Sequence, residues 1–109
     1  MANSKTSNAY MEAATVDTAP GADGYYTNEV GIRDKKLPLG RIFFSVRGTG
    51  SGTVTLEFKP AGDGSWTVYD TYTTTCRKKI EGGAAGAKWR AGIKQNDLQA
   101  GELTFGFDW

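Results

Sequence analysis

From Arg41 onward, apolar and polar residues alternate in one short run after another. The last run, Glu102 to Trp109, places Leu, Phe, Phe and Trp on one side and Glu, Thr, Gly and Asp on the other. Because strand side chains point to alternate faces, this pattern predicts a half-buried strand. The alternation therefore favours a fold of short strands that share an apolar core, with Trp109 as its last core residue.

Turn-forming residues separate these runs, among them the glycine-rich segment 48–52 and the Asp63-Gly64 pair. A phosphate-binding loop needs a helix after it, whereas a strand follows residue 52, so we expect 48–52 to link a hairpin. Short strands at this spacing predict an all-β chain folded as a single antiparallel β-sandwich. Its expected strands are 41–47, 53–59, 66–72, 73–80, 87–94 and 102–109.

Residues 1–40 differ in character, being polar and rich in small residues. We expect an extended N-terminal arm with one or two short strands, at 13–18 and 24–30. Because too few of its residues are apolar to form a core, the arm must wrap the sandwich or lie on another molecule. The expected organisation is thus an arm at 1–40 and a β-sandwich core at 41–109.

Composition argues against several kinds of function. The chain has no histidine, which removes the usual general base and the commonest zinc ligand, and its net charge of +1 argues against nucleic-acid binding. The single cysteine, Cys76, is expected to be structural and mostly buried. No apolar run is long enough to span a membrane, and the first residues do not resemble a signal peptide. We therefore assign no catalytic residue, metal ligand or cofactor, and expect a protein made inside a cell that is not an enzyme.

Charge and aromatic residues supply the remaining candidates. Residues 76–94 are rich in lysine and arginine, which indicates either solvated strand faces or a positive patch that meets an acidic protein surface. Phe43 is out of phase with its apolar neighbours, so it should lie on the outer face, where it could pack against a partner or under the arm. The candidate interface residues are Tyr10, Tyr25, Tyr26, Phe43, Arg77 and Lys79.

The aromatic residues also allow a sugar-binding platform. Against this, Trp66, Trp89 and Trp109 share the phase of the inward aliphatic residues, so we expect all three in the core.

The segments Val46–Leu56, Gly64–Tyr69, Trp89–Ile93 and Gly101–Trp109 resemble small β-sandwich virion proteins of tailed double-stranded DNA phages. Within that group they are similar to the head decoration, or cement, proteins of short-tailed phages. The resemblance implies a jelly-roll-like sandwich that is made in the host cytoplasm, sits on the capsid exterior and clamps major capsid protein subunits. It implies a dimer or trimer at a symmetry axis, without enzymatic activity. A tail or neck component and a small carbohydrate-binding module remain as alternatives.

Overall fold

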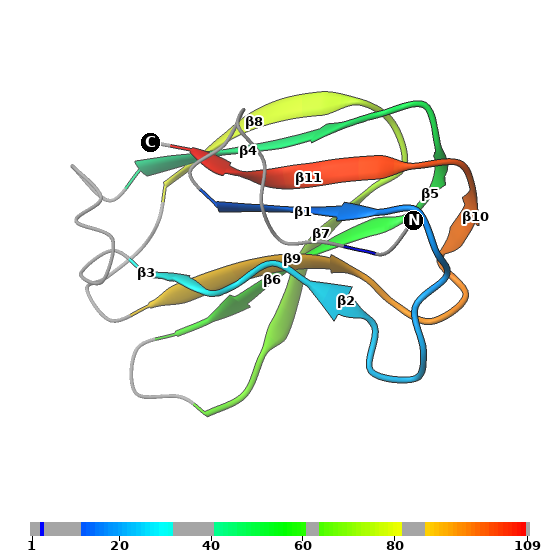
Figure 1. Ribbon diagram of the computed structural model, residues 1–109. Helices are drawn as coiled ribbons and strands as arrows, with labels where there is room; N and C mark the ends of the chain where they lie inside the picture. Colours follow the sequence, from blue (N-terminus) through cyan, green and yellow to red (C-terminus); the bar gives the residue numbers. More distant parts are fainter. Residues whose placement is uncertain (1–2, 4–11, 32–40, 61–63, 82–86, 109) are drawn as a thin grey trace.

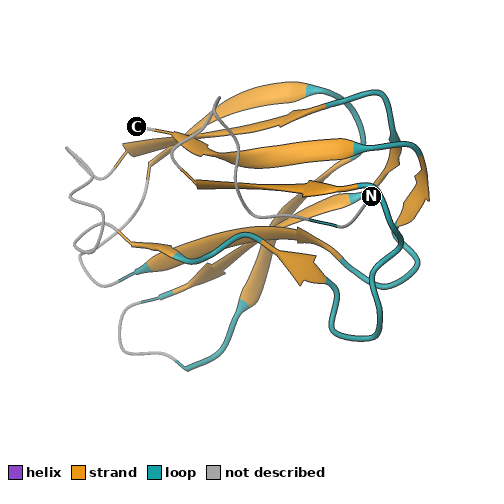
Figure 2. Cartoon of the chain, viewed as in Figure 1, coloured by secondary structure: helices purple, strands orange, loops and turns teal. Residues whose placement is uncertain are grey.

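Antiparallel strands form two facing layers (Figure 1). The structure is a computed structural model that describes residues 3, 12–31, 41–60, 64–81 and 87–108. One layer is a four-stranded sheet in the order β1-β11-β4-β8, and the other is a five-stranded sheet in the order β2-β9-β6-β7, with β3 also paired to β9. The described residues contain strands and loops only (Figure 2). The predicted all-β, jelly-roll-like sandwich is thus confirmed.

The strands follow the alternating runs of the sequence closely. The expected strand 41–47 coincides with β4, and the expected strands 53–59, 87–94 and 102–109 each match a strand within a residue at either end. Among the described residues, no helix has the length and apolarity needed to cross a membrane. The elements are β1 (Glu12–Val16), β2 (Tyr25–Tyr26), β3 (Val30–Gly31), β4 (Arg41–Arg47), β5 (Ser51–Gly52), β6 (Val54–Lys59), β7 (Thr67–Tyr72), β8 (Cys76–Glu81), β9 (Lys88–Ile93), β10 (Leu98–Ala100) and β11 (Leu103–Asp108).

Side chains from both sheets form one apolar core between the layers. Each large apolar side chain buried there stabilises the fold by about 1.5–3 kcal/mol. Trp89 is 2% exposed, as predicted for a core residue, whereas Trp109 lies outside the described residues. The core cluster comprises Ala14, Val16, Val30, Phe44, Val46, Val54, Leu56, Ile80, Trp89, Ala91, Ile93, Leu103, Phe105 and Phe107.

The described part of the N-terminal segment is built into both sheets. β1 pairs along β11 from Glu12↔Phe107 to Val16↔Leu103, and β2 and β3 both pair with β9. Between β2 and β3, the Thr27 amide donates to the Ala91 carbonyl at 2.8 Å. Of the two arrangements expected for the arm, residues 12–31 therefore wrap the sandwich. They also enter its core, because Ala14, Val16 and Val30 are fully buried. The expected boundary at residue 40 therefore does not delimit the core.

The glycine-rich segment 48–52 does not link a hairpin, which corrects the prediction. β4 and β6, on either side of it, belong to different sheets. Within the segment, β5 pairs with β10, which lies in the second connection between the layers, at the right of Figure 1. The Gly50 amide donates to the Glu102 carbonyl at 2.8 Å. The connection from β4 to β6 and the connection from β9 to β11 are thus joined through their backbones. This close approach of two backbones explains why small residues occur here.

Candidate functional site

Three of the predicted interface residues lie together on the outer face of the four-stranded sheet. In the strand register, Phe43 of β4 is opposite Lys79 of β8 on one side and Asp108 of β11 on the other. Ser45 is opposite Arg77. We call the group Phe43, Ser45, Arg77, Lys79 and Asp108 the Phe43 surface.

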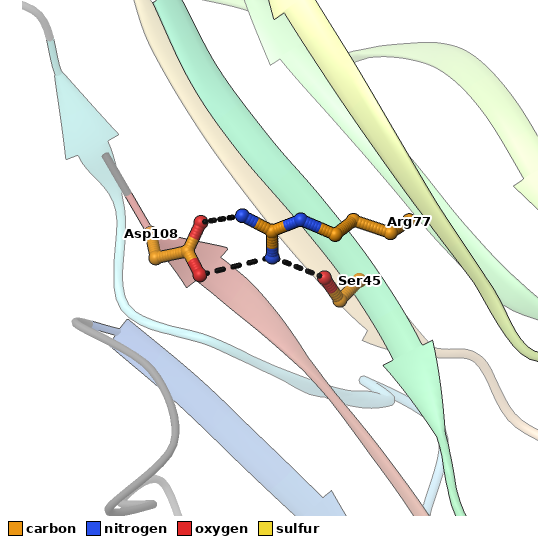
Figure 3. Close-up of polar contacts among 3 residues, drawn as sticks. All are labelled: Ser45, Arg77 and Asp108. Carbon is orange, nitrogen blue, oxygen red and sulfur yellow. Dashed lines mark hydrogen bonds and ion pairs between the residues drawn. The ribbon is translucent and has the colours of Figure 1, made fainter.

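Arg77 organises the Phe43 surface by reaching across β4 to β11 (Figure 3). Its two terminal nitrogens donate to the two carboxylate oxygens of Asp108 at 3.0 and 3.1 Å, and Nη1 also donates to Ser45 Oγ at 3.2 Å. The guanidinium carbon lies 4.6 Å from the centroid of the Phe43 ring. Because the Arg77 and Asp108 side chains are 54% and 26% exposed, water screens this ion pair, which contributes at most about 1 kcal/mol to stability. Its larger effect is to hold the aromatic ring and the cation in one arrangement.

Beside the Phe43 surface is an open hollow lined by residues of β4, β8 and β11, including Cys76, Arg77 and Asp108. Cys76 is half-buried and packs against the core cluster, in keeping with a structural cysteine. Within the described ranges, no cluster of three or more His, Cys, Asp or Glu side chains is arranged to hold a metal ion.

A second cluster occupies the outer face of the five-stranded sheet, on the opposite side of the sandwich. Arg90 of β9 donates from Nε to Oε1 of Glu57, its register partner on β6, at 2.7 Å. Lys94 Nζ lies 3.7 Å from the other carboxylate oxygen of Glu57. The Arg90 guanidinium carbon is 4.2 Å from the Tyr26 ring centroid and 4.4 Å from the Trp66 ring centroid. We call Tyr26, Glu57, Trp66, Arg90 and Lys94 the Arg90 cluster.

The Arg90 cluster encloses a carboxylate on a face where strand residues normally meet water. Glu57 is only 5% exposed, and a buried carboxylate is costly unless cations and hydrogen bonds compensate for its lost hydration. Arg90 and Lys94 supply that compensation. Burial raises the pKa of the Tyr26 phenol and the Glu57 carboxylate raises it further, while the Arg90 guanidinium lowers it. Tyr26 therefore carries no charge at physiological pH.

Gly92 explains how Tyr26 reaches this position. The two residues are register partners, and a Cβ atom at residue 92 would collide with the Tyr26 ring. The ring therefore lies directly on the β9 backbone, which only glycine permits at this position.

The structure separates the remaining predicted interface residues. Tyr25 is half-buried and packs against the core cluster, Tyr26 belongs to the Arg90 cluster, and Tyr10 lies outside the described residues. The prediction that Trp66 is a core residue is wrong. Trp66 precedes β7 and is half-buried. The side chains of Lys59 and Arg90 lie over its ring, and both point to the outer face of the sheet. Because Trp66 lies in the connection before β7, strand alternation does not determine which side of the sheet its side chain occupies.

Sequence reasoning missed three polar members of these groups, Ser45, Glu57 and Asp108. Each lies in the polar phase of an alternating run, a signal that does predict an outward position. Their partners come from strands 31 to 33 residues away in the chain, and nothing in one sequence gives that pairing.

The fold and its two surface clusters define an all-β sandwich with organised outer faces. No protein-family model matches the chain, and no curated protein matches it. Among solved structures it is similar to Drosophila melanogaster CENP-C bound to CAL1, with 8% identity, coverage of 96% of this chain and 69% of that chain, and a TM-score of 0.47. It is also similar to a Drosophila melanogaster CENP-C cupin domain, with 8% identity, coverage of 96% and 65%, and a TM-score of 0.46.

A third similar structure is that of Fe(II) HppE, with 10% identity, coverage of 86% of this chain and 40% of that chain, and a TM-score of 0.44. This chain thus spans less than two thirds of some of the chains it matches. At these TM-scores and identities, the similarities carry no argument about its function.

Proposed function

We propose that this chain is a non-enzymatic structural protein of a virus particle that decorates the capsid and cements neighbouring major capsid protein subunits. The sequence resemblance to head decoration proteins supports this proposal, and so does the sandwich fold. In the proposal the protein sits on the capsid exterior as a dimer or trimer at a symmetry axis.

The observation that carries the proposal is the Phe43 surface. An aromatic ring lies on the outside of the four-stranded sheet, beside a guanidinium that Asp108 and Ser45 hold in place. Preordered aromatic and arginine side chains lose little conformational entropy on binding, which is why such residues dominate protein interfaces. β8 also forms an edge of this sheet, with Arg77 and Lys79 exposed on it. Repetition of a modest contact over a symmetric shell would supply avidity.

The test measures sedimentation of the purified protein with capsids that lack it. Phe43→Ala and Lys79→Ala should each reduce the bound fraction, because both side chains belong to the proposed contact. Lys78→Ala is the matched control, since Lys78 is opposite the inward-facing Phe44 in the register and carries the same charge on the same strand. Full binding by Phe43→Ala, with all variants folded, would contradict the proposed contact surface.

Particle images labelled with an antibody to the chain test the location. Label over the whole shell is expected for a decoration protein. Label confined to one vertex or to the tail would instead favour the tail or neck alternative, and unlabelled particles would refute the virion function.

A further inference from the structure

Arg90 is held in place from three sides on the outer face of the five-stranded sheet. Its Nε is bonded to Glu57, and its guanidinium plane lies near the rings of both Tyr26 and Trp66. The Arg90 side chain nevertheless keeps 27% of its surface exposed. The group is therefore fixed without being covered.

The part of Arg90 that remains for a ligand is its terminal edge. A guanidinium carries N–H donors on Nε, Nη1 and Nη2, in a planar fork that matches a carboxylate. Among the residues that the structure describes, the hydrogen bond recorded for Arg90 is the one from Nε. The donors on Nη1 and Nη2 are thus preordered by Glu57 and the two rings, so a second carboxylate could bind them with little loss of side-chain entropy.

The surroundings of Arg90 are positively charged and partly apolar. On the outward positions of β6 and β9 and just beyond β9, the four cations Lys59, Lys88, Arg90 and Lys94 outnumber the two carboxylates, Glu57 and Asp97, that act on Tyr26. Val68, opposite Glu57 in the register, is 48% exposed. An arginine beside aromatic and apolar side chains, with lysines around them, is the composition of a protein-binding hot spot and its rim.

The positions of the rings favour a protein ligand over a sugar. A sugar platform needs an open ring face, but Tyr26 lies on Gly92 and beside Arg90, and both Lys59 and Arg90 lie over the Trp66 ring. Glu29 lines the hollow next to Tyr26 and Arg90, and its negative charge would repel an acidic ligand on that side. A negatively charged ligand is therefore expected to approach from the Trp66 and Lys59 side.

We propose that the outer face of the five-stranded sheet is a docking surface for an acidic protein segment, anchored by a carboxylate that binds the Nη1 and Nη2 edge of Arg90. Val68 supplies the apolar contact, and Lys59 and Lys94 attract the negative charge. This surface is separate from the Phe43 surface and does not depend on the capsid function proposed above.

The test is a titration of the full chain with an oligo-glutamate peptide at low salt, followed by backbone amide NMR shifts. Shifts are expected in β6, β9 and the Trp66 segment. Arg90→Lys should weaken binding about tenfold, because lysine keeps the charge but loses the bidentate fork. Arg47→Lys, at an exposed position of β4 on the other sheet, is the matched control and should bind like the unchanged protein.

Several outcomes would overturn this proposal. Unchanged affinity of a folded Arg90→Lys variant, or shifts centred on β4 and β8, would show that Arg90 is not the anchor. Inorganic phosphate that reproduces the shifts and displaces the peptide would indicate a small-anion site. Arg90-dependent binding of an oligogalacturonate, but not of oligo-glutamate, would indicate an acidic-glycan site. Shifts on β4 and β8 would point to the Phe43 surface instead, and the other results would leave binding through Phe43 and Lys79 untouched.

Discussion

At the scale of single residues, Tyr72 links the pH of the solution to the stability of the sandwich. Its ring lies 5.2 Å from that of Phe44, across the two sheets. Burial, followed by the nearby Asp70 carboxylate, raises the pKa of the Tyr72 phenol from 10.0 to about 12. Since the folded state holds the proton more tightly than the unfolded state, the resulting stability is complete below pH 10 and is lost as pH rises towards about 12.

We therefore predict that the urea midpoint of the protein falls across this pH range, and that it falls less steeply in Tyr72→Phe. Phenylalanine keeps the ring contact with Phe44 but cannot ionise. The phenolate absorbance of the folded protein, titrated in parallel, should lose its latest-ionising component in the variant. Identical midpoint curves for the two proteins would mean that Tyr72 does not link pH to folding. Tyr26, whose pKa is also raised, contributes to the part of the fall that Tyr72→Phe retains.

At the scale of elements, the joined connections between the sheets depend on a glycine. Gly48 has a φ of 132°, which other residues rarely adopt, and a Cβ atom there would collide with the Glu102 carbonyl oxygen. We predict that Gly48→Ala lowers the free energy of unfolding by more than about 1 kcal/mol, because it adds backbone strain to a steric clash. Gly21→Ala is the control, since a Cβ at Gly21 meets no atom within 4 Å. Equal urea midpoints for the two variants would show that the connection relaxes freely.

Alternation of apolar and polar residues predicts four of the strands well. β4, β6, β9 and β11 each bury one face under the other sheet, so burial imposes the period of two directly on their sequences. The shorter β2 and β3 lack enough residues to show a period. The pairing of β5 with β10 depends on residues far apart in the chain, which is why the sequence of segment 48–52 alone predicts a hairpin link.

The candidate site was predictable to a similar degree. Alternation correctly distinguished Phe43, on the outer face, from the fully buried Phe44 beside it. The charge of Arg77 and Lys79 makes them candidates in the sequence, and the strand register brings them to Phe43. The Arg90 cluster was not foreseen, because it joins residues from β2, β6, β9 and the segment before β7. The register shift between Leu56 and Glu57 further changes which β7 residues lie opposite β6.

At the scale of the whole molecule, the N-terminal segment supplies β1, and the stability of the sandwich depends on that strand. Along β11, β1 covers the edge opposite β4, and its Val16 side chain is fully buried. A β-sheet edge that loses its partner exposes backbone N–H and C=O groups, and the core loses the apolar area that β1 buries. The segment that looked like a detachable arm is therefore a structural part of the fold, at least over residues 12–31.

We accordingly predict that deletion of residues 1–16 destabilises the sandwich and promotes association through the bared edge of β11. Since the deletion could prevent folding altogether, Val16→Ala tests the same contact more gently and should cost about 2 kcal/mol in urea unfolding, through lost burial and the cavity left behind. Asn28→Ala, at an exposed position of the same segment, should leave the midpoint unchanged. If the shortened chain instead melts cooperatively at the temperature of the full chain and stays monomeric, β1 contributes nothing to the fold. In that case the role of β1 would lie in binding a partner molecule, and not in stabilising the core.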